Sequence, residues 1–266
     1  MPSRKPLETK RSPRVKAQAF SHIGGRKNNE DRFHAKTDLF VVADGMEGYP
    51  GGEHAAEIAC ESFAEKHGEI IKSGNPGEEL LKTFRHAQQK IEEAQSSTSS
   101  HGAMGSTVAA VALKNGVAHA VHAGDTRVYH YDWAEKKLKQ VTADHTWAQA
   151  LIDKGLPITK NHPGHSQLTQ FLGGHRNRDS VFLNKADYNH FSVSRNDAIL
   201  ICSDGLHSLL SDEEIKKEIA KPRLTWTNVA KALVAKAHKK ALEQARLEGK
   251  KPHHDNITAL FVRVKT

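Results

Sequence analysis

The chain has 266 residues, of which 37% are hydrophobic and 26% charged, and its net charge is +8. This composition is typical of a soluble globular protein and excludes a wholly disordered chain. No apolar run approaches the roughly 20 residues that a membrane-spanning helix needs, so we expect no membrane contact. Cys60 and Cys202 lie in apolar stretches without CxxC spacing, which suits buried, reduced thiols in a cytoplasmic protein.

The N-terminal arm, residues 1–16, contains six Lys or Arg residues and one acidic residue, and it therefore supplies +5 of the net charge. It has three prolines and no apolar periodicity, so we predict that it is disordered. It also lacks the apolar core of a secretory signal. The arm either stays solvated or tethers an acidic partner. Only +3 remains for residues 17–266, which argues against nucleic acid as the main partner.

We expect a folded domain over residues 17–266. Its first half is predicted to contain strands, then helices, then hairpins. Apolar patterns predict strands at 17–24 and 34–43 and helices at 53–71 and about 80–91. Asn115-Gly116 separates two β-type runs, 106–113 and 117–123, which is the strongest short hairpin signal. A second hairpin is predicted to link 128–133 to 137–142.

The second half continues with a helix at 142–155, for which Thr142 or Asp144 is the expected N-cap. Residues 156–180 are irregular. Strands are predicted at 181–187, 197–204 and 256–264. Between the last two we expect a short helix with a capping box at Ser211 and a long helix at 225–248 with Trp226 inward. Hairpins dominate and βαβ units are rare, which favours antiparallel sheets with helices packed outside them.

Acidic residues recur where predicted strands meet loops. Six such residues are Glu30, Asp31, Asp44, Asp125, Asp204 and Asp255. A single Asp-Gly pair at a strand end is usually a turn, and Asp255-Asn256 alone would be read as a cap. Several strand-end acids together suggest carboxylates that converge and need a compensating cation. An oxygen-only ligand set favours Mg²⁺ or Mn²⁺, and the number of acids fits two metals that activate a water.

Arg26 lies four residues before Glu30 in a polar loop. Its planar guanidinium could bind a phosphoryl group through two hydrogen bonds, or it could be an ordinary solvated loop residue beside Lys27.

The order and spacing of these pieces resemble the PPM family, the metal-dependent Ser/Thr protein phosphatases of type 2C. The matching segments are GGRKNNEDRF (24–33), FVVADGMEGYPGGEHAA (40–56), GSTVAAVAL (105–113), HAGDTRVY (122–129), QLTQFLG (167–173), ILICSDGLHSLLSDEEI (199–215) and DNITALFV (255–262). The resemblance runs from about residue 17 to the C-terminus, and Met46 after Asp44-Gly45 looks like the bacterial branch.

The resemblance implies an α+β fold, a four-layer αββα sandwich of two antiparallel sheets between helix pairs, and a catalytic domain over residues 17–266. It also implies roles. Asp44 would bridge two metals; the Gly45 carbonyl and Glu30 would bind one of them, and Asp204 and Asp255 the other. Asp31 would orient water, Arg26 would bind the phosphate, and Asp125 would help to hold a weaker third ion.

What the resemblance implies for function is a phosphatase that hydrolyses phosphoserine and phosphothreonine in proteins and reverses a Ser/Thr kinase. We expect it to be cytoplasmic and monomeric. The segment Leu156–His165 would be a mobile flap or an ordinary loop. Three positions depart from the family: Ser208 replaces an Asp, Glu47 replaces a Gly, and Met46 replaces the eukaryotic His. His22, His145 and His254 are then candidates for a general acid.

These departures leave two other readings open. The chain could be a catalytically weak or inactive phosphatase-like scaffold that binds phosphoproteins, or a nucleic-acid-binding module that depends on its basic arm.

Overall fold

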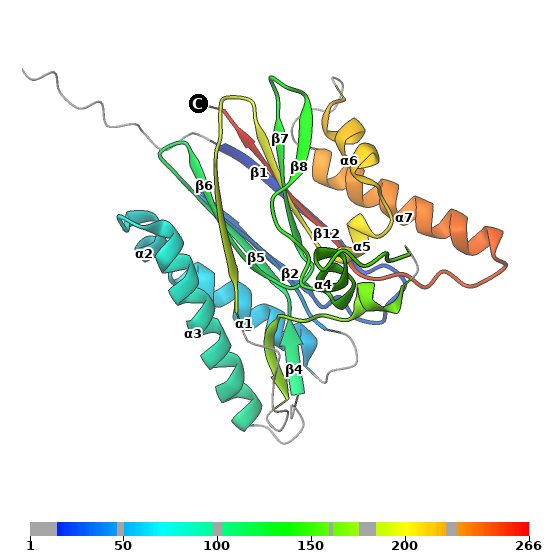
Figure 1. The fold of residues 1–266 in the computed structure, drawn as a ribbon, viewed down its shortest axis with the longest axis horizontal. Helices are drawn as coiled ribbons and strands as arrows, with labels where there is room; N and C mark the ends of the chain where they lie inside the picture. The colour runs from blue at the N-terminus through cyan, green and yellow to red at the C-terminus, as the bar shows by residue number, and fades with distance from the viewer. Residues whose placement is uncertain are drawn as a thin grey trace, which may run out of the picture.

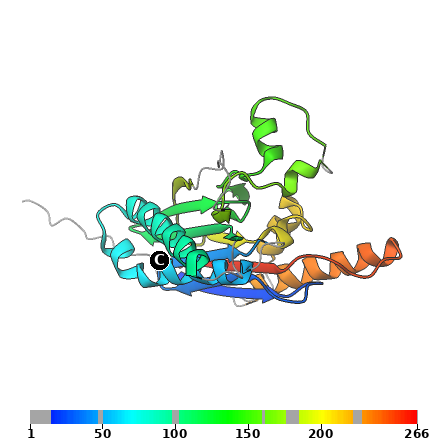
Figure 2. The same cartoon turned by 90° about the horizontal axis from the view of Figure 1, so that it is seen from below.

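Two five-stranded antiparallel sheets stack face to face and carry helices on their outer surfaces (Figures 1 and 2). The computed structural model describes residues 15–46, 51–97, 103–159, 162–175, 185–221 and 228–265. Residues 1–14 of the N-terminal arm therefore lie outside the described residues. So do Glu47 and Trp226, which the sequence analysis singled out. In the described part of the chain, no helix combines the length and the apolar character that crossing a membrane requires.

The first sheet has the strand order β1-β12-β11-β7-β8, and the second has the order β10-β6-β5-β3-β2. The strands of the first are β1 (Val15–His22), β12 (Ile257–Val264), β11 (Ala198–Cys202), β7 (Arg127–Asp132) and β8 (Lys137–Gln140). Those of the second are β10 (Asp187–Ser192), β6 (Val117–Ala123), β5 (Val108–Lys114), β3 (Leu39–Asp44) and β2 (Asp31–Lys36). A short pair, β4 (Ala103–Ser106) and β9 (Leu172–His175), forms a separate two-stranded sheet next to the end of β3, with Gly45 bridged to Ser106.

Each sheet has its own helical cover. The helices α1 (Gly52–Glu65), α2 (His67–Lys72) and α3 (Pro76–Ser97) pack on the second sheet. The helices α5 (Asp204–His207), α6 (Asp212–Ile219) and α7 (Val229–Leu247) pack on the first. A third apolar cluster fills the space between the sheets and includes Phe40, Val42, Ile199, Ile201 and Leu260. The four-layer αββα arrangement expected from the sequence is therefore present.

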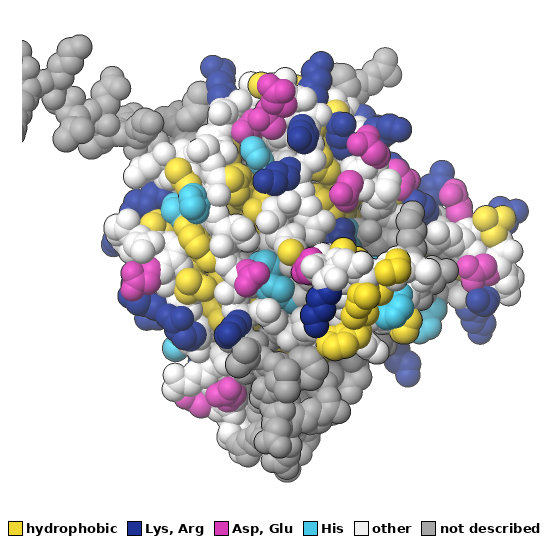
Figure 3. Space-filling view, in the orientation of Figure 1, with side chains coloured by type: hydrophobic (Ala, Val, Ile, Leu, Met, Phe, Trp, Pro, Cys, Tyr) yellow, Lys and Arg dark blue, Asp and Glu magenta, His cyan; other side chains and the backbone are white. Residues whose placement is uncertain are grey.

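The segment that contains α4 (Trp147–Asp153) and a 3₁₀ turn (Pro163–Ser166) projects from the sandwich (Figure 2). Trp147, Ile152 and Leu156 are exposed here, and hydrophobic side chains gather over α4 on the face shown in Figure 3. This segment includes the described part of Leu156–His165, which the sequence suggested as a flap.

Several predicted elements are present where the sequence placed them. The Asn115-Gly116 turn joins β5 to β6, and both residues have positive φ, 53° and 77°, as the favoured two-residue hairpin turn requires. Ser211 forms the predicted capping box with Glu214 at the start of α6. Cys60 and Cys202 are buried and not bonded to each other.

Other predicted boundaries were wrong. The expected strand 34–43 is two strands, β2 and β3, because Thr37 turns the chain with a φ of 45°. The helix 53–71 breaks at Lys66 into α1 and α2. The N-cap of α4 is Thr146, whose hydroxyl accepts a hydrogen bond from the Gln149 N–H; neither Thr142 nor Asp144 caps it.

The predicted strand 181–187 falls largely on residues outside the described ranges, and the strand in this region is β10, which begins only at Asp187. The loop predicted at 96–105 also includes the start of β4.

Candidate metal centre

The two Asp-Gly pairs lie at the ends of strands that belong to different sheets. Asp44 is the last residue of β3 in the second sheet, and Asp204 comes two residues after the end of β11 in the first, with Ser203 between them. The glycine after each aspartate has a common purpose. A Cβ on Gly45 would lie 2.5 Å from the backbone of Gly52, and one on Gly205 would lie 2.0 Å from the Asn256 carbonyl oxygen. The glycines therefore let backbone segments approach closely at this end of the sandwich.

Asp31 is the direct partner of Asp44 across the β2–β3 ladder. It is buried, with 4% of its surface exposed. Its Oδ2 accepts a 2.9 Å hydrogen bond from the hydroxyl of Ser203, which in turn accepts one of 3.0 Å from the Thr258 N–H. Ser203 precedes Asp204, so a single serine connects Asp31 in one sheet to the start of α5 beside the other.

The carboxylates at this end raise one another's pKa. Burial is the main cause for Asp44, whose pKa lies well above its usual value, and the negative charges of Asp31, Asp204, Asp125 and Asp255 add to it. Burial likewise raises the pKa of Asp31 to about 6 and that of Asp204 well above normal, and in both cases nearby acids add to the effect. Acids that are far apart in the sequence are therefore close enough to repel one another.

The donor set fits hard divalent cations. Three carboxylate oxygens, Glu30 Oε2, Asp31 Oδ1 and Asp204 Oδ1, are buried and have no hydrogen-bond partner among the described residues. Buried, unpaired carboxylate oxygens are costly unless a cation compensates them. No sulfur or imidazole takes part in this group, and oxygen-only sets select ions of the Mg²⁺ or Mn²⁺ type. The residues therefore match the kind of ion that the sequence predicted.

The loop before β2 is held against the start of β12 by Asn256. The Asn256 side chain accepts a 2.8 Å hydrogen bond from the Glu30 N–H and donates to the carbonyls of Ile23 and Asn28, at 2.7 and 3.0 Å. The side chain of Arg26 reaches from the same loop to Asp255, with Nη2 2.7 Å from Oδ2. A pocket of about 320 Å³ opens here, lined by Arg26, Glu30, Gly45 and Asp255 among others.

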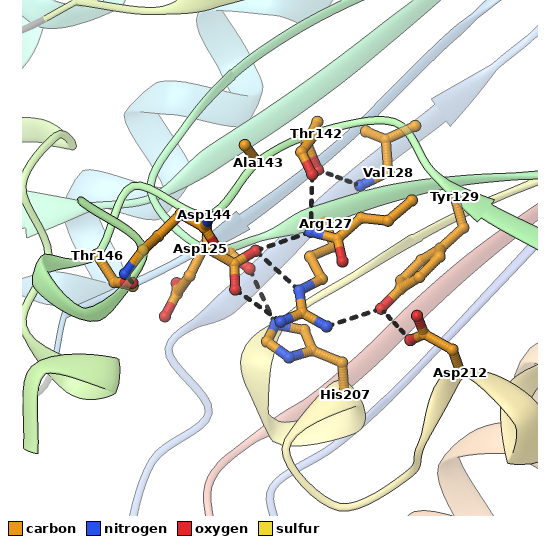
Figure 4. A network of polar contacts seen from close by, with 12 residues as sticks. Asp125, Arg127, Val128, Tyr129, Thr142, Ala143, Asp144, Thr146, His207 and Asp212 are labelled. Carbon is orange, nitrogen blue, oxygen red and sulfur yellow. Dashed lines mark hydrogen bonds and ion pairs between the residues drawn. The ribbon is translucent and has the colours of Figure 1, made fainter. Parts of the chain in front are cut away.

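Asp125 lies at the edge of this group, beside a network of polar contacts (Figure 4). It is 8% exposed, and burial and the nearby Asp144 raise its pKa to about 7. His207 donates a 2.9 Å hydrogen bond from Nε2 to the Asp125 carbonyl. Asp144 is held by Arg127 through two bonds of 2.8 and 2.6 Å, and the pKa of Asp144 is lowered. Its oxygens are thus already occupied by a cationic side chain.

The structure brings all of the acids singled out from the sequence to one end of the molecule, with Arg26 and Gly45 beside them. Sequence reasoning missed Ser203, Asn256 and Asp144 as members of this region. Asp144 had been considered only as a helix cap, and the Asp255-Asn256 pair was the one signal for Asn256.

The candidate general acids lie in different surroundings. His145 is 7% exposed, and its Nδ1 accepts a 3.2 Å hydrogen bond from the Gly124 N–H. His22 and His254 belong to a separate group with His238, in which His238 Nδ1 and His254 Nε2 are 3.0 Å apart. His253 rather than His254 lines the pocket beside Arg26.

Comparison with known proteins relates the chain to a set of bacterial phosphatases. The protein phosphatase 2C family matches residues 20–248. The chain is 29% identical over 246 residues to the serine/threonine protein phosphatase PstP of Mycobacterium tuberculosis, covering 90% of this chain and 43% of that protein. It is 28% identical over 251 residues to the serine/threonine phosphatase stp of Listeria monocytogenes, covering 89% of this chain and 90% of that protein.

The chain therefore spans less than half the length of the mycobacterial relative. A crystal structure of PstP aligns with a TM-score of 0.79 at 26% identity, covering 95% of this chain and 100% of that one. A structure of the PstP catalytic domain in complex with two manganese ions aligns with a TM-score of 0.76 at 24% identity, covering 95% and 99%.

Proposed function

The chain belongs to the protein phosphatase 2C family, and on this premise we propose that it is a metal-dependent protein phosphatase that hydrolyses phosphoserine and phosphothreonine. The observation that carries the proposal is the convergence of strand-end acids whose buried oxygens have no partner in the described part of the chain. The relatives named serine/threonine phosphatases support the same activity.

Divalent cations are the cofactors that this group of oxygens suits. We propose two Mg²⁺ or Mn²⁺ ions, in keeping with the two manganese ions of the PstP complex. Asp44 would bridge them, Glu30 and the Gly45 carbonyl would bind one, and Asp204 and Asp255 the other. Such ions supply charge neutralisation at the phosphate and lower the pKa of a water so that it can attack phosphorus.

The chain's own side chains would bind and orient the substrate. Arg26 is fixed beside Asp255 and lines the pocket, so its guanidinium would bind two phosphate oxygens at the mouth of the site. Asp31 keeps its Oδ1 without a partner among the described atoms while Ser203 holds Oδ2. This free oxygen would accept a hydrogen bond from the attacking water and hold it in line.

Asp125 would contribute to a weaker third ion. Ser208 is exposed and stands where the family commonly has an acidic residue, and the Asp144 oxygens are taken up by Arg127. Asp125 would therefore lack a second carboxylate of this kind, and the affinity of a third ion should be low.

The proposed substrates are phosphorylated proteins, and the proposed partner is a Ser/Thr kinase whose products the enzyme would dephosphorylate in the cytoplasm as a monomer. An inactive scaffold is the less favoured reading, because all of the acids proposed as metal ligands are present and the charges of several raise one another's pKa.

The test is release of phosphate from a phosphothreonine peptide with Mn²⁺ or Mg²⁺ and with EDTA. Asp44→Asn should abolish the metal-dependent rate, whereas Glu243→Gln, an exposed acid of α7, should leave it unchanged. A folded wild-type chain that binds Mn²⁺ but releases no phosphate would favour the scaffold.

A further inference from the structure

A second group of possible metal ligands lies outside the carboxylate centre. It consists of His122 near the end of β6, His145 in the loop before α4, and Asp187 at the first position of β10. One ligand atom from each lies within 4.8 Å of the other two. The three residues come from segments that are distant in sequence, so their proximity is a product of the fold.

His122 is oriented as metal-binding histidines usually are. It is 1% exposed, and its Nε2 lies 2.8 Å from the Ala143 carbonyl, to which it donates. A backbone carbonyl on one ring nitrogen fixes the tautomer and leaves a lone pair on the other. That other nitrogen, Nδ1, is buried and has no hydrogen-bond partner in the described ranges. Burial also lowers the pKa of His122 to about 4, so the ring is neutral at neutral pH.

His145 and Asp187 complete the group. The rings of His145 and His122 stack with their centroids 4.4 Å apart. His145 Nε2 is buried, makes no hydrogen bond to a described residue, and lies 3.2 Å from Asp187 Oδ2. The Asp187 side chain is 57% exposed, so an ion could enter from solvent on its side. Two buried nitrogens and one accessible carboxylate therefore face the same space.

The other histidine group is less suited to an ion. His238 Nδ1 and His254 Nε2 already face each other at 3.0 Å, and His22 Nδ1 accepts a 2.9 Å hydrogen bond from the Gly24 N–H. Three of its ring nitrogens therefore already have a partner without a metal, and His254 Nδ1 is buried with no hydrogen-bond partner among the described residues. This group therefore provides a matched comparison of the same side-chain chemistry.

We propose that His122, His145 and Asp187 bind a transition-metal ion of the Zn²⁺ class. Two imidazoles and one carboxylate suit Zn²⁺ and its neighbours, whereas Mg²⁺ prefers oxygen ligands only. His145 must carry its proton on Nδ1 when Nε2 binds the ion, so the 3.2 Å hydrogen bond from Gly124 is given up. His122 and Asp187 are therefore the principal ligands, and His145 completes the site at the cost of that bond.

An ion here would connect β6 and β10 to the base of the projecting segment. His145 anchors that base: its carbonyl accepts a 2.8 Å hydrogen bond from the Thr169 N–H, and Trp147 N–H donates to Gln167 at the same distance. The site shares no ligand with the proposed phosphatase centre, although His145 hydrogen-bonds to Gly124 beside Asp125, and its occupancy is expected whether or not the chain hydrolyses phosphoproteins.

The experiment is calorimetric titration of the full chain with Zn²⁺ in a large excess of Mg²⁺, which competes with Zn²⁺ for the carboxylate centre. We expect one Zn²⁺ per chain. Asp187→Asn should weaken binding by about tenfold or more, since even outer-shell changes cost 10–100-fold. His238→Asn, in the other histidine group, should leave the affinity unchanged. Asp187 is at the surface, so its variant should fold, which circular dichroism checks.

Cobalt provides a second measurement on the same variants. Co²⁺ bound by His122, His145 and Asp187 should give a visible absorption band that Asp187→Asn alters and His238→Asn does not. The proposal is overturned by absence of Zn²⁺ binding in excess Mg²⁺, by binding that Asp187→Asn leaves intact, or by binding that His238→Asn removes.

Discussion

The hydroxyl of Ser203 donates a 2.9 Å hydrogen bond to Asp31, 172 residues away in the sequence. Asp31 opens a strand of one sheet, and Ser203 follows a strand of the other. The same hydroxyl accepts a hydrogen bond from the Thr258 N–H in β12. Ser203 therefore fixes the position of Asp31 relative to Asp204 through a bond that crosses between the sheets.

Replacing Ser203 by Ala should destabilise the chain and weaken its response to metal. The substitution removes the hydroxyl that bonds both the buried Asp31 Oδ2 and the Thr258 N–H, and each lost bond to a buried group costs about 1–3 kcal/mol. Chemical denaturation in EDTA measures the loss of stability, and a titration of phosphatase activity with Mn²⁺ should need more metal. Ser203→Thr, which keeps the hydroxyl, should retain more of both properties; equal loss in the two variants would point to crowding instead.

The metal-free chain should lose stability as pH rises. Asp31 and Asp125 have pKa values of about 6 and 7 in the folded chain, against the usual 3.8, because burial disfavours their charged forms. At intermediate pH the folded state then binds more protons than the unfolded state. The free energy of unfolding that Asp31 and Asp125 contribute is therefore greatest below about pH 4 and is lost as the pH rises through 6–7. The change should amount to a few kcal/mol.

Denaturant unfolding in EDTA between pH 5 and 8 measures this trend. Saturating Mg²⁺ should reverse it, because the ion binds the deprotonated carboxylates and so stabilises the folded chain more at higher pH. A metal-free stability that increases from pH 5 to 8 would contradict the proposed burial of these acids.

Arg26→Ala should raise KM for a phosphopeptide about tenfold or more and change kcat less, if Arg26 binds the phosphate in the ground state. A hydrogen bond to a charged group contributes about 1.5–3 kcal/mol. Arg26→Lys keeps the charge but not the two-pronged geometry, and should recover only part of the loss. Steady-state kinetics in saturating Mn²⁺ separates the two constants. An unchanged KM in the Ala variant would remove Arg26 from substrate binding.

Gly205→Ala should be far more harmful than Gly68→Ala. A Cβ at Gly205 would lie 2.0 Å from the Asn256 carbonyl oxygen, and this backbone oxygen can move only by shifting the start of β12 and Asp255 with it. We expect a loss of about 1–3 kcal/mol in stability together with most of the activity. Gly68 has open space in α2, so Ala there should be neutral or slightly stabilising. Thermal unfolding and phosphate release compare the pair.

Asp44, Asp125, Asp204 and Asp255 could be found from the sequence because each lies close to an apolar run, and Glu30 and Asp31 because they lie in the loop between two predicted strands. Buried strands such as β3 and β11 read as continuous apolar stretches, and a charged residue at their end stands out. The hairpin at Asn115-Gly116 and the capping box at Ser211 were predictable because they depend on neighbouring residues alone.

Features that depend on distant contacts could not be found in this way. β2 lies at the edge of its sheet, and its polar, half-exposed pattern joined to β3 resembled one long strand. Thr37 makes the intervening turn without the glycine that would have revealed it. Asn256 gathers three backbone groups from residues more than 220 positions away, and no local pattern predicts such a role.

The glycines after Asp44 and Asp204 also show the limit of local reasoning. A turn with left-handed backbone is the usual reason for an Asp-Gly pair. Neither Gly45 nor Gly205 has a positive φ, and both instead permit close approach of another backbone segment.

Asp44 belongs to one sheet and Asp204 follows a strand of the other, and the apolar layer that contains Val42 and Ile201 packs the two sheets together, in addition to the Ser203–Asp31 hydrogen bond. A slight slide of one sheet over the other would separate the two carboxylates before any strand came apart. The rate of phosphate release should therefore depend on packing between the sheets. Removing one methyl group from a side chain deep between them should lower this rate while the circular dichroism spectrum stays native.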